Sequence, residues 1–418
     1  MDHSIIKKII RDCFRIDRIN YGRAPVLTVA HDNDRSLLHN GKFYSPLIDT
    51  MEDDLARRGV ASISIARIIS TIKGELAYGR VLSPEGAFAR SLLFKRLRGV
   101  LVRGRYPYSS SEEAIWGRIL DQTGAGKVFG IQPSRELCVA CHKRDIWVAD
   151  VQHGVIADTH PWYGAAFRAG DPVEQLPSAF LCWDPGSARV ISPWATPKGI
   201  ATEVIGNRWL SRFARPSADD ALVHELAGAF GRPLADSARP TILLTLSWGC
   251  DNIPNGHIAQ GLESVIRATS QRYRWLIRLH PNQLRGFATH EGPDFMRYFE
   301  QALQGHAQWD QPSAAPLPVV LGESALHISW NSSVCIEAAQ MGIRSALLNP
   351  VLRDPRLCGD YYSYYREAGM VDLIDEGAPS ITAWIENNIA SRGAPEAFHA
   401  SDAAYRRILD AIAVGQLK

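Results

Sequence analysis

The sequence predicts an α/β fold built from two Rossmann-like, doubly wound domains that face each other across a cleft. Short apolar runs alternate with helical patterns in both halves of the chain, and a loop-rich stretch separates the halves. Strands that alternate with helices form a parallel sheet with helices on both faces. The 418 residues, 46% of them hydrophobic, are enough for two domains of roughly 200 residues each, every one with its own hydrophobic core.

The individual elements follow from apolar periodicity. In the first half, residues 4–17 predict an amphipathic helix, 49–58 a second helix, and 25–30, 61–65, 146–151 and 179–183 strands. In the second half we expect strands at 241–246, 273–279, 317–321, 326–330 and 345–348, and helices at 257–270, 294–304 and 334–341. The remainder, 372–418, is expected to be mostly helical.

Turn-forming residues at 216–220 and 231–240 place the domain junction in this region. We therefore expect an N-terminal domain over 1–215, a C-terminal domain over 238–375, and C-terminal helices over 376–418 that could pack back on the first domain.

Charge and hydropathy exclude several classes of protein. With 46 basic and 44 acidic residues the net charge is only +2, so no nucleic-acid partner is expected. The N-terminus lacks a signal-peptide pattern, and no apolar run reaches the ~18 residues of a membrane span. We expect a cytoplasmic protein without a spanning helix.

One segment has a strongly one-sided charge. Six basic and no acidic residues lie between Arg90 and Arg105, interleaved with apolar ones. A solvated helix face is one interpretation. Contact with anionic lipid headgroups or a lipid diphosphate at the inner face of the membrane is the other.

The seven cysteines are odd in number and fit reduced thiols. Cys138, Cys141 and His142 spell a c-type haem attachment motif, but covalent haem normally requires export. Haem and zinc are therefore the less favoured alternatives to ordinary structural residues.

Polar residues that follow the second-half strands are the candidates for ligand binding, because ligands of open α/β sheets bind at the carboxyl ends of strands. Trp248 and Gly249 follow the first of these strands, and His280 and Pro281 the next. A glycine allows close backbone approach, and a histidine can donate to a phosphate oxygen.

A further strand ends in Asn331, Ser332 and Ser333, which lead into a helix containing Glu337. Hydroxyls at a helix start can cap the helix and bind an anion, and a carboxylate one turn later could accept hydrogen bonds from ribose hydroxyls. Alone, these residues would fit an ordinary helix cap.

In the first half, Gln152 and His153 follow the strand at 146–151, with His160 close behind; His31 and Asp32 follow the first strand. Because histidine has an intrinsic pKa near ~6.5, His153 could remove a proton from an attacking hydroxyl.

The order of these motifs resembles the bacterial GT-B transferases of capsule, lipopolysaccharide and teichoic-acid synthesis, including Kdo, sialic-acid and CDP-glycerol transferases. The matching residues span roughly 145–350 and are Gln152-His153-Gly154, Ile205-Gly206-Asn207, His280-Pro281, Ser332-Ser333 and Glu337.

The resemblance implies a glycosyltransferase that uses a nucleotide sugar and a cell-surface polysaccharide or lipid-linked glycan acceptor. The C-terminal domain would bind the donor through Trp248, Gly249, His280, Pro281, Asn331, Ser332, Ser333 and Glu337. His153 and His280 would be catalytic, with His153 as base or acceptor-orienting group, and the acceptor side would include His31, Asp32 and His160.

No cofactor is expected beyond the donor, whose nucleotide (CMP, UDP, GDP or CDP) stays open. Asp32-Asn33-Asp34 has the spelling of a divalent-ion motif of the other major glycosyltransferase fold, but it follows the first strand, so metal-independent transfer is favoured. The alternatives are a nucleotide-sugar epimerase of the same fold and a non-catalytic carbohydrate-binding scaffold.

Overall fold

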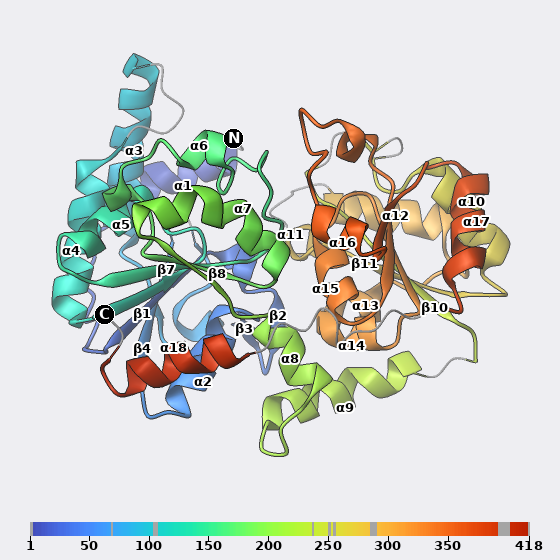
Figure 1. The fold of residues 1–418 in the computed structure, drawn as a ribbon, viewed down its shortest axis with the longest axis horizontal. Coiled ribbons are helices and arrows are strands. Elements are labelled where there is room, and N and C mark those ends of the chain that lie inside the picture. The colour runs from blue at the N-terminus through green and yellow to red at the C-terminus, as the bar shows by residue number, and fades with distance from the viewer. Residues whose placement is uncertain are drawn as a thin grey trace. The chain divides into compact units, whose positions relative to one another are not determined.

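The computed structural model describes residues 3–67, 70–102, 108–235, 238–249, 252–253, 256–284, 291–391 and 402–416. The chain divides into two compact units (Figure 1). Unit 1 consists of Met1–His153, Gly164–Ile205 and Ser401–Lys418, and unit 2 of Gly154–Tyr163 and Gly206–Ala400. Each unit is an α/β structure with its own sheet.

Unit 1 contains a seven-stranded parallel sheet in the order β5-β4-β1-β6-β7-β8-β9. Its strands are β1 (Val26–Ala30), β4 (Ser62–Ala66), β5 (Val81–Leu82), β6 (Lys127–Gly130), β7 (Trp147–Val151), β8 (Ala179–Cys182) and β9 (Ala201–Val204). Its helices of four residues or more are α1 (His3–Cys13), α2 (Ile48–Ala56), α3 (Glu85–Val102), α4 (Ser110–Thr123), α5 (Arg135–His142), α6 (Ala165–Arg168), α7 (Pro185–Ala195) and α18 (Ala403–Ala413).

Both faces of this sheet are covered, which explains why its strands read as continuous apolar runs. Leu27 of β1 packs in a core with residues of α4 and α5, whereas the adjacent Val26 packs in a core with α2 and α18. Successive side chains of a strand point to opposite faces. A small antiparallel hairpin, β2 (Leu37–His39) and β3 (Lys42–Tyr44), turns at Asn40 and Gly41, both with positive φ, as a two-residue hairpin loop requires.

The cysteine motif lies in the core of unit 1. Cys138 and Cys141 are fully buried in α5 among apolar side chains, and burial raises the pKa of Cys138 to about 12. The following His142 bonds through Nε2 to the carbonyl oxygen of Leu176 at 3.0 Å. These residues therefore pack as parts of a core helix, and the described residues contain no cluster suited to a metal ion.

Unit 2 contains a five-stranded parallel sheet in the order β11-β10-β12-β13-β14. The strands are β10 (Thr241–Thr245), β11 (Arg274–Arg278), β12 (Leu326–Ser329), β13 (Arg344–Leu347) and β14 (Val371–Leu373). The helices of four residues or more, apart from short 3-10 turns, are α8 (Arg208–Ala214), α9 (Ala221–Ala235), α10 (Gln260–Thr269), α11 (Pro281–Leu284), α12 (Glu291–Ala302), α13 (Asp310–Ala314), α14 (Leu317–Gly322), α15 (Val334–Gln340), α16 (Ser363–Glu367) and α17 (Ala378–Asn388).

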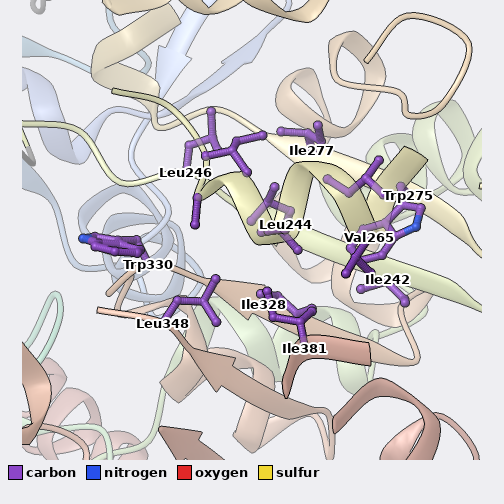
Figure 2. Close-up of a cluster of buried hydrophobic side chains, with 14 of the residues drawn as sticks. Ile242, Leu244, Leu246, Val265, Trp275, Ile277, Ile328, Trp330, Leu348 and Ile381 are labelled. Atoms are coloured by element: carbon purple, nitrogen blue, oxygen red, sulfur yellow. The ribbon is translucent and has the colours of Figure 1, made fainter. Parts of the chain in front are cut away.

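The main core of unit 2 lies on one face of this sheet (Figure 2). Ile242 and Leu244 of β10 pack with Trp275 and Ile277 of β11 and with Val265 of α10. The core continues to the carboxyl edge of the sheet, where its members are Leu246, Trp330 and Leu348. The loops that follow the strands therefore start from a rigid base.

Two expectations about elements need correction. The run at 317–321 is the helix α14, not a strand: Pro318 lies in its first turn, and Val320 and Leu321 pack with β10 and β11 residues. Five apolar residues fit a short buried helix as well as a strand. Strand β14, at 371–373, lies at the start of the segment expected to be mostly helical.

The units also divide the chain differently from the expected domains. Helices α8 and α9, at the expected junction, belong to unit 2, and so does α17, whose Ile381 and Trp384 pack in the unit 2 core. Only α18 of the C-terminal helices packs in unit 1. No helix among the described residues is both long and apolar enough to cross a membrane.

Candidate functional site

The candidate site is the carboxyl edge of the unit 2 sheet. All its strand pairs are parallel, so the loops after β10, β11, β12 and β13 emerge at the same edge. β10 lies between β11 and β12, which places the ends of those two strands about 10 Å apart at ~4.8 Å per strand. The expected motifs at His280 and Ser332-Ser333 therefore share one edge, at a separation that a nucleotide diphosphate can bridge.

His280, two residues after the end of β11, is oriented by its own turn. Its Nδ1 accepts a hydrogen bond from the backbone N–H of Asn282 at 3.2 Å, so the tautomer that fits carries its proton on Nε2. The ring of Trp248 lies against it, with centroids 5.7 Å apart and planes inclined by 33°. His280 thus presents an N–H donor, and the partly exposed Trp248 indole provides a flat surface beside it.

A carboxylate joins the loops that carry these two rings. Glu291 accepts from the backbone N–H of Gly249 and from Nε2 of Gln283, both at 3.1 Å. Gln283 in turn accepts from the backbone N–H of His280 at 2.8 Å. Gly249 has φ of +66°, a backbone conformation that favours glycine. Sequence patterns gave no indication of Glu291, because its partner Gly249 lies in another loop 42 residues earlier.

Asn282, in the short helix that begins with Pro281, is a buried polar side chain that needs explanation. It is 1% exposed, and neither its amide oxygen nor its amide nitrogen has a hydrogen-bond partner among the described residues. The hydroxyl of Ser247, on the neighbouring loop, is also buried and without a partner in this part of the chain. Buried polar groups of this kind are rare in native proteins, and polar ligand atoms would satisfy them.

The two serines after β12 have different surroundings. The Ser332 hydroxyl accepts from the backbone N–H of Val334, the first residue of α15, at 3.3 Å. Ser333, at the N-cap position, makes no side-chain capping bond. A Cβ placed on Gly154 would lie 3.7 Å from the Ser333 hydroxyl oxygen. The glycine of the His153-Gly154 step is therefore next to the second serine.

Glu337, one turn into α15, connects two further motifs. Its Oε1 accepts from Nδ2 of Asn207 at 3.5 Å, and Asn207 also caps α8 by accepting from the N–H of Leu210. Burial raises the pKa of Glu337 to about 7, although the charge of Arg278 and the Asn207 bond oppose the increase. Arg278 is held by bonds to the carbonyl oxygens of Pro312 and Ala315, and burial lowers its pKa to about 10. Asn207, of the Ile205-Gly206-Asn207 step, thus bonds to this carboxyl group, and the charge of Arg278, two residues before His280, acts on it.

A second set of hydrogen bonds fixes the loop after β12. The indole Nε1 of Trp330 donates to Asn252, and Asn252 donates to Asn349, both at 3.1 Å. The Tyr362 hydroxyl donates to the carbonyl oxygen of Asn331 at 2.9 Å. Asn331 therefore contributes its backbone here, and the loops after β10, β12 and β13 are linked.

The remaining expected residues lie elsewhere. His153 follows β7 as the last unit 1 residue of its segment, and its side chain is exposed. The preceding Gln152 is buried and bonds to Ser187 at 3.0 Å and to the backbone N–H of Trp183 at 2.6 Å. A rigid strand end thus carries an exposed imidazole.

Asp32 and His31 follow β1. Asp32 is buried and accepts three hydrogen bonds, from the backbone N–H and hydroxyl of Thr71 and from the N–H of Ile72. Its carboxylate therefore holds the segment after β4 in place. Burial lowers the pKa of the half-buried His31 imidazole, which favours its neutral form. Asn33, the middle residue of the Asp-x-Asp motif, has a side chain outside the described structure.

His160 belongs to unit 2, unlike the first-domain placement expected from sequence. Its Nδ1 accepts from the backbone N–H of Trp162 at 3.1 Å, and its ring lies 5.1 Å from Tyr163 and 6.4 Å from Tyr361. Close by in sequence, the Thr159 hydroxyl donates to Asp360 at 2.5 Å. These contacts fasten residues 154–163 to the unit 2 segment that contains α16.

No family model matches the sequence, and no curated protein matches it. Solved structures do resemble the fold. The chain is similar to the UDP-GlcNAc 2-epimerase from Neisseria meningitidis bound to UDP-GlcNAc, with a TM-score of 0.55, 16% identity, and coverage of 94% of this chain and 100% of that one.

The chain is also similar to the wall teichoic acid polymerase TagF, with a TM-score of 0.57, 11% identity and full coverage of both chains. The epimerase from Methanocaldococcus jannaschii has a TM-score of 0.55 at 10% identity and covers 93% of this chain and 99% of its own. At these identities the likeness concerns the fold. Together with the two parallel sheets, it confirms the expected α/β fold of two Rossmann-like domains of GT-B type.

Proposed function

We propose that this protein is a glycosyltransferase that moves a sugar or polyol phosphate from a nucleotide-activated donor to a cell-surface polysaccharide or lipid-linked glycan. The observation that carries the proposal is the hydrogen bond between Glu337 and Asn207, under the charge of Arg278, at the sheet edge that also holds His280 and Ser333. Motifs far apart in sequence thus supply polar groups to one edge of the sheet.

The donor would lie along this edge. His280 donates its Nε2 proton to a phosphate oxygen, together with the hydroxyls of Ser332 and Ser333. Glu337 accepts from the ribose hydroxyls, and Trp248 with Gly249 borders the nucleotide. The buried amide of Asn282 and the hydroxyl of Ser247 would then gain ligand partners.

In the reaction, the bond between the transferred group and the nucleotide phosphate breaks, and the phosphate keeps the electron pair. The acceptor hydroxyl oxygen forms the new bond and loses its proton to a base, the role we assign to His153. Donors placed around the phosphate stabilise its increasing negative charge. Histidine and hydroxyl groups supply those donors here, so the proposed step is metal-independent.

The nature of the acceptor is inferred from resemblance. TagF, one of the similar structures, is a wall teichoic acid polymerase, and one of its structures was obtained with CDPG. Its similarity extends over the whole chain. This similarity supports a cell-surface polymer as the acceptor of the proposed transfer.

Donor binding tests the site. A thermal-shift panel of CMP-, CDP-, GDP- and UDP-linked donors should identify one nucleotide class that raises the melting temperature. His280→Ala or Ser333→Ala should then weaken its binding roughly 10- to 100-fold, because each loses a hydrogen bond to a charged group. His224→Ala, on the exposed face of α9, is the matched control and should bind as wild type. Donor turnover that survives both site substitutions would refute this assignment.

Nucleotide-sugar epimerisation is the second candidate, because the Neisseria meningitidis enzyme has the same fold over 94% of this chain. The two reactions differ in their need for an acceptor. Incubation with UDP-GlcNAc alone, followed by proton NMR, would reveal an epimer from an epimerase, whereas a transferase would leave the sugar configuration unchanged. A donor that binds tightly and never reacts would indicate a carbohydrate-binding scaffold.

A further inference from the structure

Unit 1 exposes a group of large apolar side chains on α1, the segment that follows it, and α3. Phe14 is 83% exposed, Ile16 78%, Phe94 61% and Ile10 50%, and Leu93 is also exposed. We call these five residues the α1–α3 patch. Exposed apolar side chains scattered singly are ordinary, but several together mark an interaction surface.

The two helices that carry most of the patch, α1 and α3, pack together (Figure 1). The guanidinium of Arg90 donates to the carbonyl oxygens of Cys13 and Arg15, both at 2.9 Å. Arg90, Leu93 and Phe94 are spaced by three and four residues and share one helix face. The face of α3 that carries Leu93 and Phe94 is therefore joined through Arg90 to the residues on either side of Phe14.

The charge around the patch has one sign. The exposed charged side chains of α1, of the segment after it and of the adjoining turns of α3 are basic: Lys7, Arg11, Arg15, Arg18, Arg90 and Arg96.

The acidic side chains of these segments have other roles. Asp12 and Glu85 are buried, and Glu85 pairs with Lys73. Asp17 accepts from the backbone N–H groups of Gly86 and Ala87 at 3.1 and 2.8 Å, at the start of α3. The surface is therefore cationic with projecting apolar groups.

The expected basic run between Arg90 and Arg105 contributes only in part. Lys95 points away from the patch and pairs with Glu136 at 2.7 Å and Glu112 at 3.4 Å. The side chains of Arg98, Arg103 and Arg105 lie outside the described structure. Most of the described basic side chains around the patch come from α1 and the residues after it. The sequence had not indicated a lipid contact for that segment.

We propose that the α1–α3 patch docks unit 1 on an anionic lipid bilayer. Basic side chains attract anionic headgroups, and Phe, Ile and Leu enter the boundary between headgroups and acyl chains. A second copy of this chain is a poorer occupant, because two such patches would bring like charges together. The proposal does not depend on the transferase assignment, since binding to lipid requires no donor.

Vesicle flotation with the full chain tests this. The protein should float with phosphatidylcholine vesicles that contain about one third phosphatidylglycerol, and much less with phosphatidylcholine alone. Raising the salt from 50 to 500 mM should release it, because salt screens the charges. The double variant Phe14→Ser/Ile16→Ser should lower the partition coefficient about tenfold or more.

Phe167→Ser/Val173→Ser is the matched control, because it removes two exposed apolar residues of unit 1 outside the patch and should bind as wild type. Arg15→Glu/Arg18→Glu tests the charge independently of the apolar groups and should also lower the partition coefficient about tenfold or more. Three results would each overturn the proposal: wild type that does not float at low salt, patch variants that float normally, or a dimer in light scattering that dissociates in the Phe14→Ser/Ile16→Ser variant.

Discussion

At the scale of single residues, Glu337 is a carboxyl group whose pKa lies near neutral pH. Its burial favours the protonated form, and Arg278 with Asn207 favours the ionised form. The resulting pKa of about 7 means that small changes of pH alter its charge. A group of this kind is typical of functional sites, although ion pairs in the interior also perturb pKa values.

Donor affinity should therefore depend on pH through Glu337. If the ionised carboxylate accepts the ribose hydroxyls, affinity should rise up to about tenfold between pH 6 and 8, as the proton is lost. Glu337→Gln should bind donor about tenfold more weakly at pH 8 and remove that component of the pH dependence. Isothermal titration calorimetry across this range, with the exposed Glu300→Gln as control, measures it. An unchanged pH profile in Glu337→Gln would exclude the role.

His327 is the opposite case, a histidine kept neutral by the core. It is fully buried in β12, bonds through Nε2 to the Thr245 hydroxyl at 2.7 Å and through Nδ1 to the Ser345 hydroxyl at 2.9 Å, and so joins three strands. Burial lowers its pKa to about 3. The unfolded chain therefore binds one more proton than the folded chain between about pH 3 and the usual value near ~6.5.

Unit 2 should consequently lose stability as the pH falls from 6.5 towards 3, with His327 contributing at most ~1.4 kcal/mol per pH unit. His327→Gln can still donate and accept but does not titrate, so its unfolding free energy should fall less steeply between pH 6.5 and 4.5. Urea unfolding of wild type, His327→Gln and the exposed His224→Gln at several pH values would decide. Parallel curves for wild type and His327→Gln would contradict the expectation.

At the scale of elements, the two serines at the start of α15 differ in their hydrogen bonds. The Ser332 hydroxyl accepts a helix N–H, whereas the Ser333 hydroxyl makes no capping bond. Ser332→Ala should therefore lower the unfolding free energy of unit 2 by about 1 kcal/mol, the usual net contribution of one hydrogen bond. Ser333→Ala should leave stability within about 0.5 kcal/mol of wild type and weaken donor binding.

Denaturant unfolding and donor titration of both variants provide the comparison, with Ser332→Ala as the reference for the stability lost with the helix-start bond. If Ser333→Ala is the less stable one and binds donor normally, then the hydroxyl has a structural role and the assignment fails.

How much the sequence could predict also differs between elements. The buried strands β1, β10 and β12 are apolar runs within a few residues of their expected bounds, because parallel strands covered on both faces leave a strong pattern. Strand β6, Lys-Val-Phe-Gly, is too short and mixed to produce one. The apolar run at 317–321 was expected to be a strand but is a helix. Five residues are too few to distinguish the periodicity of a strand from that of a helix.

The candidate site shows the same limit. The positions of His280, Ser332 and Ser333 at the sheet edge could be predicted, because each lies two to four residues after a strand, which is a local property of the sequence. The Asn207–Glu337 bond joins residues 130 positions apart, and Glu291 reaches Gly249 across 42. Asp32 was expected on the acceptor side, but its carboxylate accepts hydrogen bonds from the backbone of Thr71 and Ile72. Contacts of this kind are visible only after folding.

At the scale of the whole molecule, the end of the chain completes the unit formed by its beginning. Helix α18 packs against α2 and β9 of unit 1. Tyr405 donates to the buried Asp54 at 2.9 Å, and Arg58 bonds to Asp410 at 2.7 Å, each across about 350 residues of sequence. Leu409 is fully buried in the same core.

Removing buried atoms from α18 should therefore destabilise unit 1, although the substitution lies at the C-terminal end of the sequence. Leu409→Ala should cost about 2–5 kcal/mol, because it leaves a cavity against β1 and α2. Val414→Ala, 66% exposed directly after the helix, should cost less than about 0.5 kcal/mol. In differential scanning calorimetry, Leu409→Ala should lower the transition of unit 1 and leave that of unit 2 in place, because α18 contributes to the core of unit 1 alone. If Leu409→Ala shifts the transition of unit 2 instead, or shifts neither transition, then the end of the chain does not stabilise unit 1.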